Sequence, residues 1–362
     1  MAIERFQCPN CRADMEFDPE TSGMKCSYCG TKQEVTAGKT VEVKENPLSS
    51  AALRPDPSRI RRLSEISKEF TCNGCGATVQ FEPPQVAGTC PFCAASIVVQ
   101  PKESDPLIAP DGVLPFAVPK PAAASSVGNW LASRWFAPNA LKAIGKPEGI
   151  QGVYLPFWTF DANTLTPYRG SRGDYYYETV TRLEEVNGRQ VERQVQERRT
   201  EWREVEGEVP VSFNDILVPA SKSINPAKLS KLAPWELGNI KPYEPAYVAG
   251  FQSQRYQVEL AEGFGTGKAA MEAAVEAAIR GQIGGDEQQI SGYQIRYSGL
   301  TFKHLLLPVW IGAYRLQGKA YQVIVNAQTG EVQGERPYSF GKLVLLIAAV
   351  LLVVMWIAAS SR

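Results

Sequence analysis

Histidine, unclustered cysteine and net charge are all scarce in this sequence of 362 residues. It has one histidine, His304, and its eight cysteines all fall in two paired groups, which leaves none for a Cys–His catalytic pair. Basic and acidic side chains number 38 each, so the overall field is not one that steers a protein to nucleic acid or acidic lipid. The opening MAIERFQCPN has charge and cysteine where a secretion signal has an apolar core, so reduced thiols are expected.

A short module occurs twice: FQCPNCRADMEF starts at residue 6, and FTCNGCGATVQF starts at residue 70. Each copy has a C-x2-C pair, fourteen intervening residues and a second C-x2-C pair. Two such turns bring four thiolates into a tetrahedral shell, which most often holds Zn²⁺. The sequence therefore predicts two structural zinc sites, although spacing alone leaves a rubredoxin-like iron site open. The ligands are Cys8, Cys11, Cys26 and Cys29 in the first site, and Cys72, Cys75, Cys90 and Cys93 in the second.

The charge of the two modules argues against nucleic-acid binding. Residues 1–45 carry six basic and eight acidic side chains, and residues 66–103 carry two and three. Neither is the positive face that phosphate neutralisation requires, so protein binding is favoured. The basic cluster RPDPSRIRR at 54–62 lies in the linker, where solvated charge is favoured over contact with phosphate or anionic lipid. Two rigid binding heads on a flexible linker are the expected arrangement.

The chain ends in KLVLLIAAVLLVVMWIAASSR, in which residues 343–359 are an unbroken apolar run. A buried core helix usually keeps some polar face, so this run predicts a membrane-spanning tail anchor. Because thiolate sites belong in reduced cytosol, the expected location is the inner (cytoplasmic) membrane, single-pass, with the bulk of the protein facing the cytoplasm.

The middle of the chain predicts two β-α-β-β units. Strand-like GVYLPFWTFDA follows the helical pattern AAASSVGNWLASRWF, and strand-like FKHLLLPVW follows the helical pattern GKAAMEAAVEAAIRGQI, with RYQVELAEGF expected as a strand before it. Asn187-Gly188 between alternating segments predicts a long exposed hairpin across 175–205. The predicted fold class is α+β: two small all-β zinc ribbons, an α+β body with two β-α-β-β units, and one C-terminal transmembrane helix.

Several stretches resemble catalytic motifs but lack residues that those motifs require. The stretch EGFGTGKAAMEAAV has Glu262 and Ala269 where a phosphate-binding loop has glycine and Ser or Thr. His304 lies in an apolar strand-like run, and no G-x-S-x-G elbow is present. A loop or helix cap is the commoner role for the acidic pair Asp286 and Glu287. We therefore expect no enzyme, no catalytic residue and no cofactor other than zinc, and we identify no small-molecule substrate.

Each module resembles the zinc ribbon at the start of transcription factor IIB. Four further motifs, DILVPAS, IGGDEQ, FKHLLLPVW and VNAQTGEVQGERPYS, resemble a bacterial family of tail-anchored zinc-ribbon membrane proteins, which is often labelled as primosomal protein N′ (PriA-like) helicases. The resemblance covers almost the whole chain, but the ATPase motifs of a helicase are missing. Related proteins look like partners of flotillin-like and phage-shock-type envelope-stress proteins, which implies an adaptor role.

The expected domains follow from these patterns: ribbon 1 at 1–40, a linker at 41–65, ribbon 2 at 66–102, the body at 103–340 with halves at about 110–220 and 245–340, and the tail anchor at 341–360. The predicted function is a non-catalytic, membrane-tethered zinc-ribbon adaptor. It binds other proteins at the cytoplasmic face of the membrane, in envelope stress or membrane organisation. The alternative is a nucleic-acid-binding protein in replication restart or phage-related DNA metabolism, without its own helicase motor.

Overall fold

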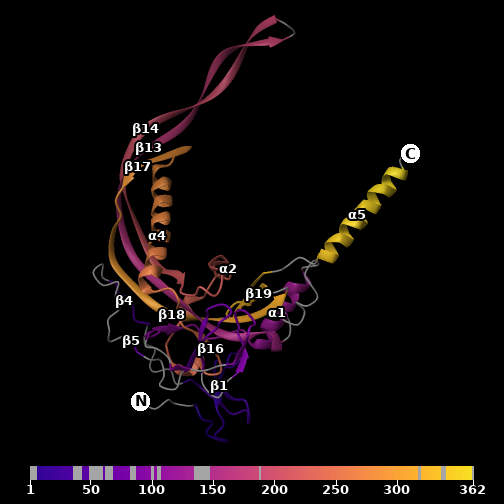
Figure 1. The fold of residues 1–362 in the computed structure, drawn as a ribbon. Helices are drawn as coiled ribbons and strands as arrows, with labels where there is room; N and C mark the ends of the chain where they lie inside the picture. The colour runs from indigo at the N-terminus through magenta and orange to yellow at the C-terminus, as the bar shows by residue number, and fades with distance from the viewer. Residues whose placement is uncertain are drawn as a thin grey trace.

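Long β-strands dominate the chain (Figure 1). The computed structural model describes residues 6–35, 43–48, 60–61, 68–81, 87–98, 102–103, 107–133, 147–186, 189–316, 319–335 and 340–360. Strand residues make up 47% of the structure and helical residues 24%. Most strands belong to one 13-stranded sheet, and the central strand β13 (Gln151–Val186) is 36 residues long.

The elements of the two ribbons are short. Those of ribbon 1 are β1 (Met15–Asp18), β2 (Gly23–Cys26) and β3 (Lys32–Gln33), and those of ribbon 2 are β6 (Lys68–Thr71), β7 (Thr78–Phe81), β8 (Ala87–Thr89) and β9 (Ser96–Val98). Six further strands are two residues long: β4 (Asn46–Pro47), β5 (Ile60–Arg61), β10 (Lys102–Glu103), β11 (Leu107–Ile108), β12 (Gly112–Val113) and β15 (Lys241–Pro242).

The body contains the long strands and the helices other than the C-terminal one. Its other strands are β14 (Arg189–Pro219), β16 (Gln252–Gln254), β17 (Glu287–Tyr293), β18 (Arg296–Leu316), β19 (Lys319–Asn326) and β20 (Val332–Gly334). The helices are α1 (Lys120–Ala132), α2 (Pro226–Lys231), α3 (Pro245–Val248), α4 (Leu260–Ile283) and α5 (Phe340–Ser360), with 3₁₀ turns at Pro147–Gly149 and Leu237–Asn239.

The predicted fold class is wrong. The structure is mostly β-sheet, and the two expected β-α-β-β units are not separate, because residues 151–165 of β13 pair antiparallel with β18 and merge both halves into one sheet. Ribbon 2 also joins this sheet through β7. Hydrophobic periodicity indicates where strands lie but carries no information on which strands pair, so the sequence could not reveal one continuous sheet.

Several individual elements agree with the sequence. The helix α1 and the strands within 151–161 and 302–310 lie where their patterns place them. The predicted hairpin is β13–β14, which runs far out of the body as a two-stranded arm, and its expected turn at 187–188 lies outside the described residues. RYQVELAEGF is not a strand, because α4 begins within it, at Leu260.

Helix α4 packs on one face of the sheet beside β13 and β14 (Figure 1). Two glycines let it approach closely: a Cβ at Gly263 would lie 2.6 Å from Trp158 Cδ1, and a Cβ at Gly267 would lie 2.7 Å from Phe160 Cδ2. The glycines of EGFGTGK thus make room for aromatic rings of β13. The helix buries one residue every three or four positions against the sheet: Leu260, Gly263, Gly267, Met271, Val275, Ile279 and Ile283.

The C-terminal helix α5 runs away from the body (Figure 1). Crossing a membrane takes about 20 consecutive apolar residues. Within the described residues, no helix has an apolar stretch of the length that a crossing requires. On this finding the predicted C-terminal transmembrane helix and the predicted inner-membrane location are wrong.

Candidate metal centres and projecting arm

Four tight turns with the same backbone pattern hold the cysteines. In the first turn, the N–H of Arg12 donates to the Cys8 carbonyl at 2.9 Å, and the N–H of Cys8 donates to the Ala13 carbonyl at 2.8 Å. The turns that begin at Cys26, Cys72 and Cys90 repeat both bonds. The fifth residue of each turn has a positive φ, with values of 62° at Arg12, 76° at Gly30, 72° at Gly76 and 53° at Ala94.

The positive φ predicts that Gly76→Ala and Ala94→Gly, one in each half of ribbon 2, change the free energy of unfolding in opposite directions. Gly76→Ala should lower the free energy of unfolding by about 1 kcal/mol, because the left-handed conformation penalises a Cβ. Ala94→Gly should raise it, by less than about 1 kcal/mol. No atom lies within 4 Å of a Cβ built at Gly76, so the pair isolates the backbone effect. Denaturant unfolding of the metal-loaded protein measures both, and a loss of stability in both variants would contradict the assignment.

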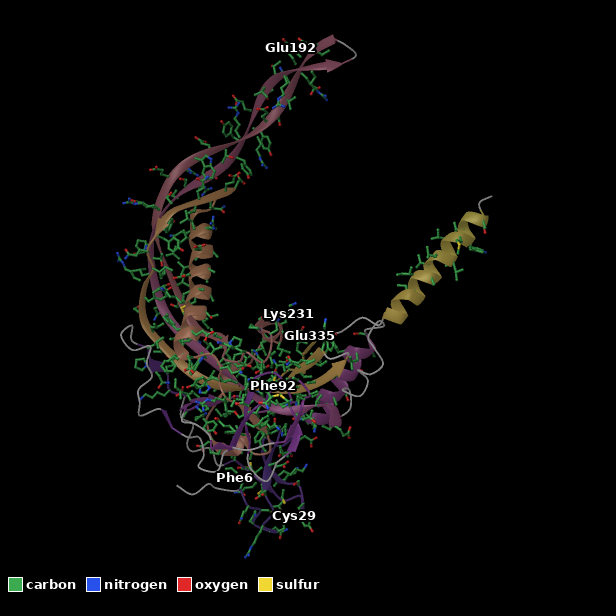
Figure 2. All side chains as sticks on the ribbon, in the orientation of Figure 1. Phe6, Cys29, Phe92, Glu192, Lys231 and Glu335 are labelled. Carbon is green, nitrogen blue, oxygen red and sulfur yellow. The ribbon has the colours of Figure 1, made fainter. Side chains whose placement is uncertain are left out.

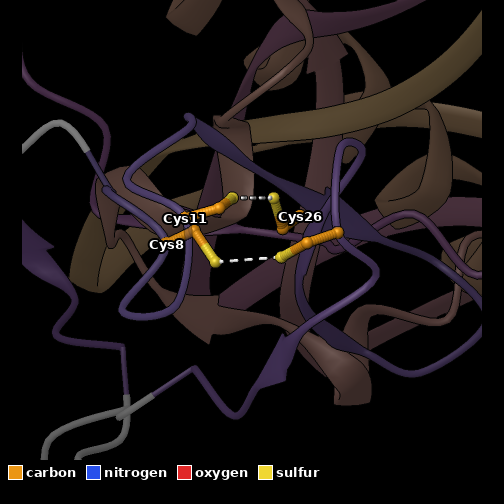
Figure 3. A group of neighbouring side chains, drawn as sticks. Cys8, Cys11 and Cys26 are labelled. Atoms are coloured by element: carbon orange, nitrogen blue, oxygen red, sulfur yellow. Dashed lines mark hydrogen bonds between the residues drawn. The ribbon is translucent and has the colours of Figure 1, made fainter.

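The thiols in each ribbon converge as a tetrahedral site requires. In ribbon 1, Sγ–Sγ distances are 3.4 Å for Cys8–Cys29 and 3.5 Å for Cys11–Cys26 (Figure 3). In ribbon 2, they are 3.6 Å for Cys72–Cys93 and 3.8 Å for Cys75–Cys90. Tetrahedral Zn–S bonds of about 2.3 Å put sulfurs about 3.8 Å apart. All four sulfurs of each group lie within 4.8 Å of one another, so all eight predicted ligands come together in two four-cysteine groups that can hold metal ions.

The pKa is lowered for Cys8 and Cys29 in ribbon 1 and for Cys75 in ribbon 2. A hydrogen bond with the Thr31 hydroxyl, at 3.1 Å from Sγ, lowers the pKa of Cys29 to about 6, and the Thr31 backbone contributes. The hydrogen bond with Cys90 lowers the pKa of Cys75 to about 5, and the same bond together with burial raises the pKa of Cys90. Because metals bind thiolates, Cys29 and Cys75 are the ligands that lose their protons first.

Ribbon 2 is built into the body. Strand β7 pairs antiparallel with β16 at Val79↔Gln254, and β16 pairs in turn with β13. The Gln322 side chain donates to the Phe92 carbonyl at 2.6 Å, and Phe92 lies in the middle of the body (Figure 2). Cys72 and Cys90 share one apolar core with Phe92 and with body residues, which include Leu114, Val153, Leu155 and Leu307. Its metal group is therefore a part of the body core.

Ribbon 1 forms its own three-stranded sheet but also rests on the body. The Phe17 N–H donates to the Ala249 carbonyl at 3.1 Å, and the Phe17 ring meets the Tyr247 ring edge-on with centroids 5.5 Å apart. Cys29 lies at the outer end of this ribbon (Figure 2). The two ribbons are thus held against one body and are not freely linked heads, and the basic cluster at 54–62 lies outside the described residues except for 60–61.

A charge cluster, which the sequence did not indicate, lies where the long strands bend; Lys303, Asp161 and Asp215 are poorly exposed in it, and Glu45 is exposed. The Lys303 ammonium is 2.8 Å from Asp215, 3.4 Å from Asp161 and 3.3 Å from Glu45. Asp161 stands opposite two residues of β14, Asn214 and Asp215, which form a β-bulge. Burial raises the pKa of Asp161, against the hydrogen bond from the Asp215 N–H and the charge of Lys303. The four residues are far apart in sequence, so no local pattern could reveal the cluster.

The residues with apparent catalytic potential have structural contacts. His304 is buried, its Nδ1 lies 2.8 Å from the Ile108 carbonyl oxygen, and its ring lies 4.8 Å from the Trp158 ring. Asp286 accepts a hydrogen bond from the Tyr175 N–H at 2.7 Å, and Glu287 accepts one from the Tyr175 hydroxyl at 2.8 Å. The acidic pair therefore fastens the base of the arm.

The two faces of the arm differ. Because Gly170 of β13 lies against Ile283 of α4, even-numbered residues of β13 define the α4 side, here called the inner face. Beyond α4 this face carries a ladder of cross-strand ion pairs: Asp174–Arg203, Glu178–Arg199, Arg182–Glu197 and Glu184–Arg193. The charges that suggested a solvated hairpin in the sequence are thus largely neutralised in pairs on the inner face.

The opposite, outer face of the arm is aromatic and mostly uncharged. Trp202 lies over Gly173, where a Cβ would come within 3.1 Å of the indole, and Arg198 lies 4.2 Å above the centre of the Tyr175 ring. Tyr177 and Leu183 are 66% and 64% exposed. Along the arm the described outer face consists of Tyr175, Tyr177, Thr179, Thr181 and Leu183 on β13, and of Gln190, Glu192, Gln194, Gln196, Arg198, Thr200 and Trp202 on β14.

Comparison with known proteins finds likeness over nearly the whole chain. The chain is similar to the uncharacterized protein YdjG of Bacillus subtilis (strain 168), with 27% identity over 342 residues, which span 94% of this chain and 92% of that protein. No family model matches the chain, and no solved structure matches it. The likeness therefore includes the body and is not confined to the cysteine modules.

Proposed function

We propose that this chain is a non-catalytic adaptor that binds other proteins through the outer face of its arm, with Zn²⁺ as the structural metal of both four-cysteine groups. Four thiols fill all four positions of a tetrahedral zinc site, so neither water nor substrate has an open position. The contacts of His304, Asp286 and Glu287 support the absence of catalysis, because each already has a packing or fastening role.

The observation that carries the proposal is the contrast between the two faces of the arm. Protein interfaces are enriched in Tyr and Trp, and a few such residues supply most of the binding energy. The outer face displays Tyr177, Leu183 and Trp202 on the arm, which projects from the body (Figure 2). On the inner face the charged side chains pair with one another. A projecting pair of strands with exposed aromatic side chains suits a protein partner.

The resemblance to zinc-ribbon partners of flotillin-like and phage-shock-type proteins supplies the proposed partner class. Nucleic acid is less well supported, because the inner-face arginines Arg182, Arg193, Arg199 and Arg203 each pair with a carboxylate. Phosphate binding needs arginine and lysine that can replace counterions. Binding of nucleic acid is the alternative outcome of the experiment below.

A matched pair of arm variants tests the proposal. Tyr177→Ser with Leu183→Ser alters the outer face, and Tyr176→Ser with Val191→Ser alters exposed apolar positions on the inner face. The tagged full chain is used to recover partners from cells with and without nuclease, followed by mass spectrometry. The outer-face variant should recover at least tenfold less of each partner, as expected for residues that contribute about 2 kcal/mol, and the inner-face variant should match the unaltered chain.

Two results would contradict this assignment. Equal recovery by both variants would place the binding surface elsewhere on the molecule. Loss of all partners after nuclease treatment would identify nucleic acid as the ligand and would favour a role in replication or phage-related DNA metabolism.

A further inference from the structure

Among the described residues, no strand pairs along the arm with the edge of β14 that faces away from β13. In the part of the chain that the structure describes, β13 is the strand partner of β14, paired from Phe157↔Pro219 to Val186↔Arg189. Strand β17 covers the opposite edge of β13 and stops at Gly173. An uncovered strand edge offers a row of N–H and C=O groups to another strand.

The backbone groups at this edge can be assigned residue by residue. The Gly173 carbonyl accepts from the Asp286 N–H at 2.9 Å, and the Tyr175 N–H donates to the Asp286 carboxylate, so both point away from β14. Their directly opposite residues, Trp202 and Thr200, consequently point away from β13. Alternation then turns the backbone groups of every second residue toward the bare edge: Gln190, Glu192, Gln194, Gln196, Arg198 and Thr200.

We propose that a second copy of this chain pairs with this edge, antiparallel, so that Val195 stands opposite Val195 of the second copy. Each residue from 190 to 200 then lies directly opposite one residue of the second copy, and the two side chains are on the same face of the sheet. Glu197 stands opposite Arg193 of the second copy, and Glu192 stands opposite its Arg198. By symmetry each ion pair forms twice, and within 190–200 no like charges stand opposite each other.

Neighbouring registers lose this match. Centring the pairing on Gln196 places Arg199 opposite Arg193 of the second copy. Centring it on Glu197 places Glu197 opposite Glu197 of the second copy, so both registers bring like charges together. Centring it on Gln194 leaves Glu197 opposite Val191 and forms no ion pair within 190–200. The charge pattern thus specifies one register among its neighbours, as sheets require for unique pairing.

The ion pairs within one arm extend across the proposed contact. On the inner face, Arg182 already pairs with Glu197, and Arg193 pairs with Glu184 at 3.1 Å. Joining Glu197 to Arg193 of the second copy produces a row of four alternating charges across β13, β14 and the two strands of the second arm. The pairing creates a four-stranded antiparallel sheet and leaves the outer aromatic faces of both arms on one side. The partner proposal does not depend on this pairing.

A charge swap at Glu192 and Arg198 tests the pairing, because neither residue belongs to the inner ladder. Glu192→Arg alone and Arg198→Glu alone each place two pairs of like charges opposite each other, which should weaken self-association of the full chain about tenfold or more. The double variant should restore the dissociation constant to within about threefold of the unaltered chain. An equal mixture of the two single variants, carrying different tags, should form the mixed pair. Sedimentation equilibrium and tag capture measure these outcomes.

A charge swap on the body surface provides the control for these variants. Lys222→Glu with Glu262→Lys reverses an exposed ion pair away from the arm and should leave self-association unchanged. Single variants that associate like the unaltered chain would overturn the proposal, as would a double variant that fails to recover. Failure of these tests would leave the outer-face variants of the partner experiment unaffected, so the two proposals fail separately.

Discussion

Replacement of Cys72 by serine is expected to destabilise the whole body of the protein, not just ribbon 2. A structural zinc site supplies roughly 10–16 kcal/mol of folding free energy in isolated modules, and three thiols cannot close the shell. Because Cys72 shares an apolar core with Leu114 and Val153, and β7 continues the sheet into β16, the loss should spread into β13. We expect the free energy of unfolding to fall by more than about 3 kcal/mol.

The matched variant Cys8→Ser should act more locally. Ribbon 1 has a separate sheet and meets the body mainly through side chains such as Phe17 and Tyr247. Each variant should bind one metal ion in reducing buffer, where the unaltered chain binds two. Amide hydrogen exchange distinguishes the cases: Cys72→Ser should expose amides in 151–160, whereas Cys8→Ser should leave them protected. Equal exchange in the two variants would show that ribbon 2 is not coupled to the body core.

Replacement of Lys303 by methionine is the second change with a large expected effect. Its ammonium is buried between the carboxylates of Asp161 and Asp215, which are also poorly exposed. Methionine fills a similar volume but leaves two carboxylates without their cation. Removing one partner of a buried ion pair costs about 3–5 kcal/mol, so the free energy of unfolding should fall by that amount.

An exposed lysine provides the control for this measurement. Lys222 pairs with Glu262 at 2.9 Å, and both side chains are more than half exposed. Lys222→Met should therefore change stability by less than about 1 kcal/mol. Chemical unfolding at neutral pH compares the two, and a Lys303→Met protein as stable as the Lys222→Met protein would mean that water reaches the cluster.

How much the sequence can predict depends on the range of the interaction. Cysteine spacing identifies the metal groups because each C-x2-C turn is made by neighbouring residues. Alternating side chains likewise identify the hairpin, whose strands are adjacent in the chain. The pairing of Val79 with Gln254 joins residues far apart in the chain, so the merging of ribbon 2 with the body was out of reach. The Lys303 cluster draws on four distant segments for the same reason.

The arrangement of Lys303 has a mechanical consequence. It joins Asp161 to Asp215 at the bulge where β13 and β14 bend, and both strands run on unbroken to the tip of the arm. The 25 residue-to-residue steps from Asp161 to Val186 extend about 80 Å along the strand at about 3.3 Å each. A tilt of about 10° at the bulge would carry Val186 sideways by about 14 Å, so a small change in the contacts of Lys303 is enlarged along the arm.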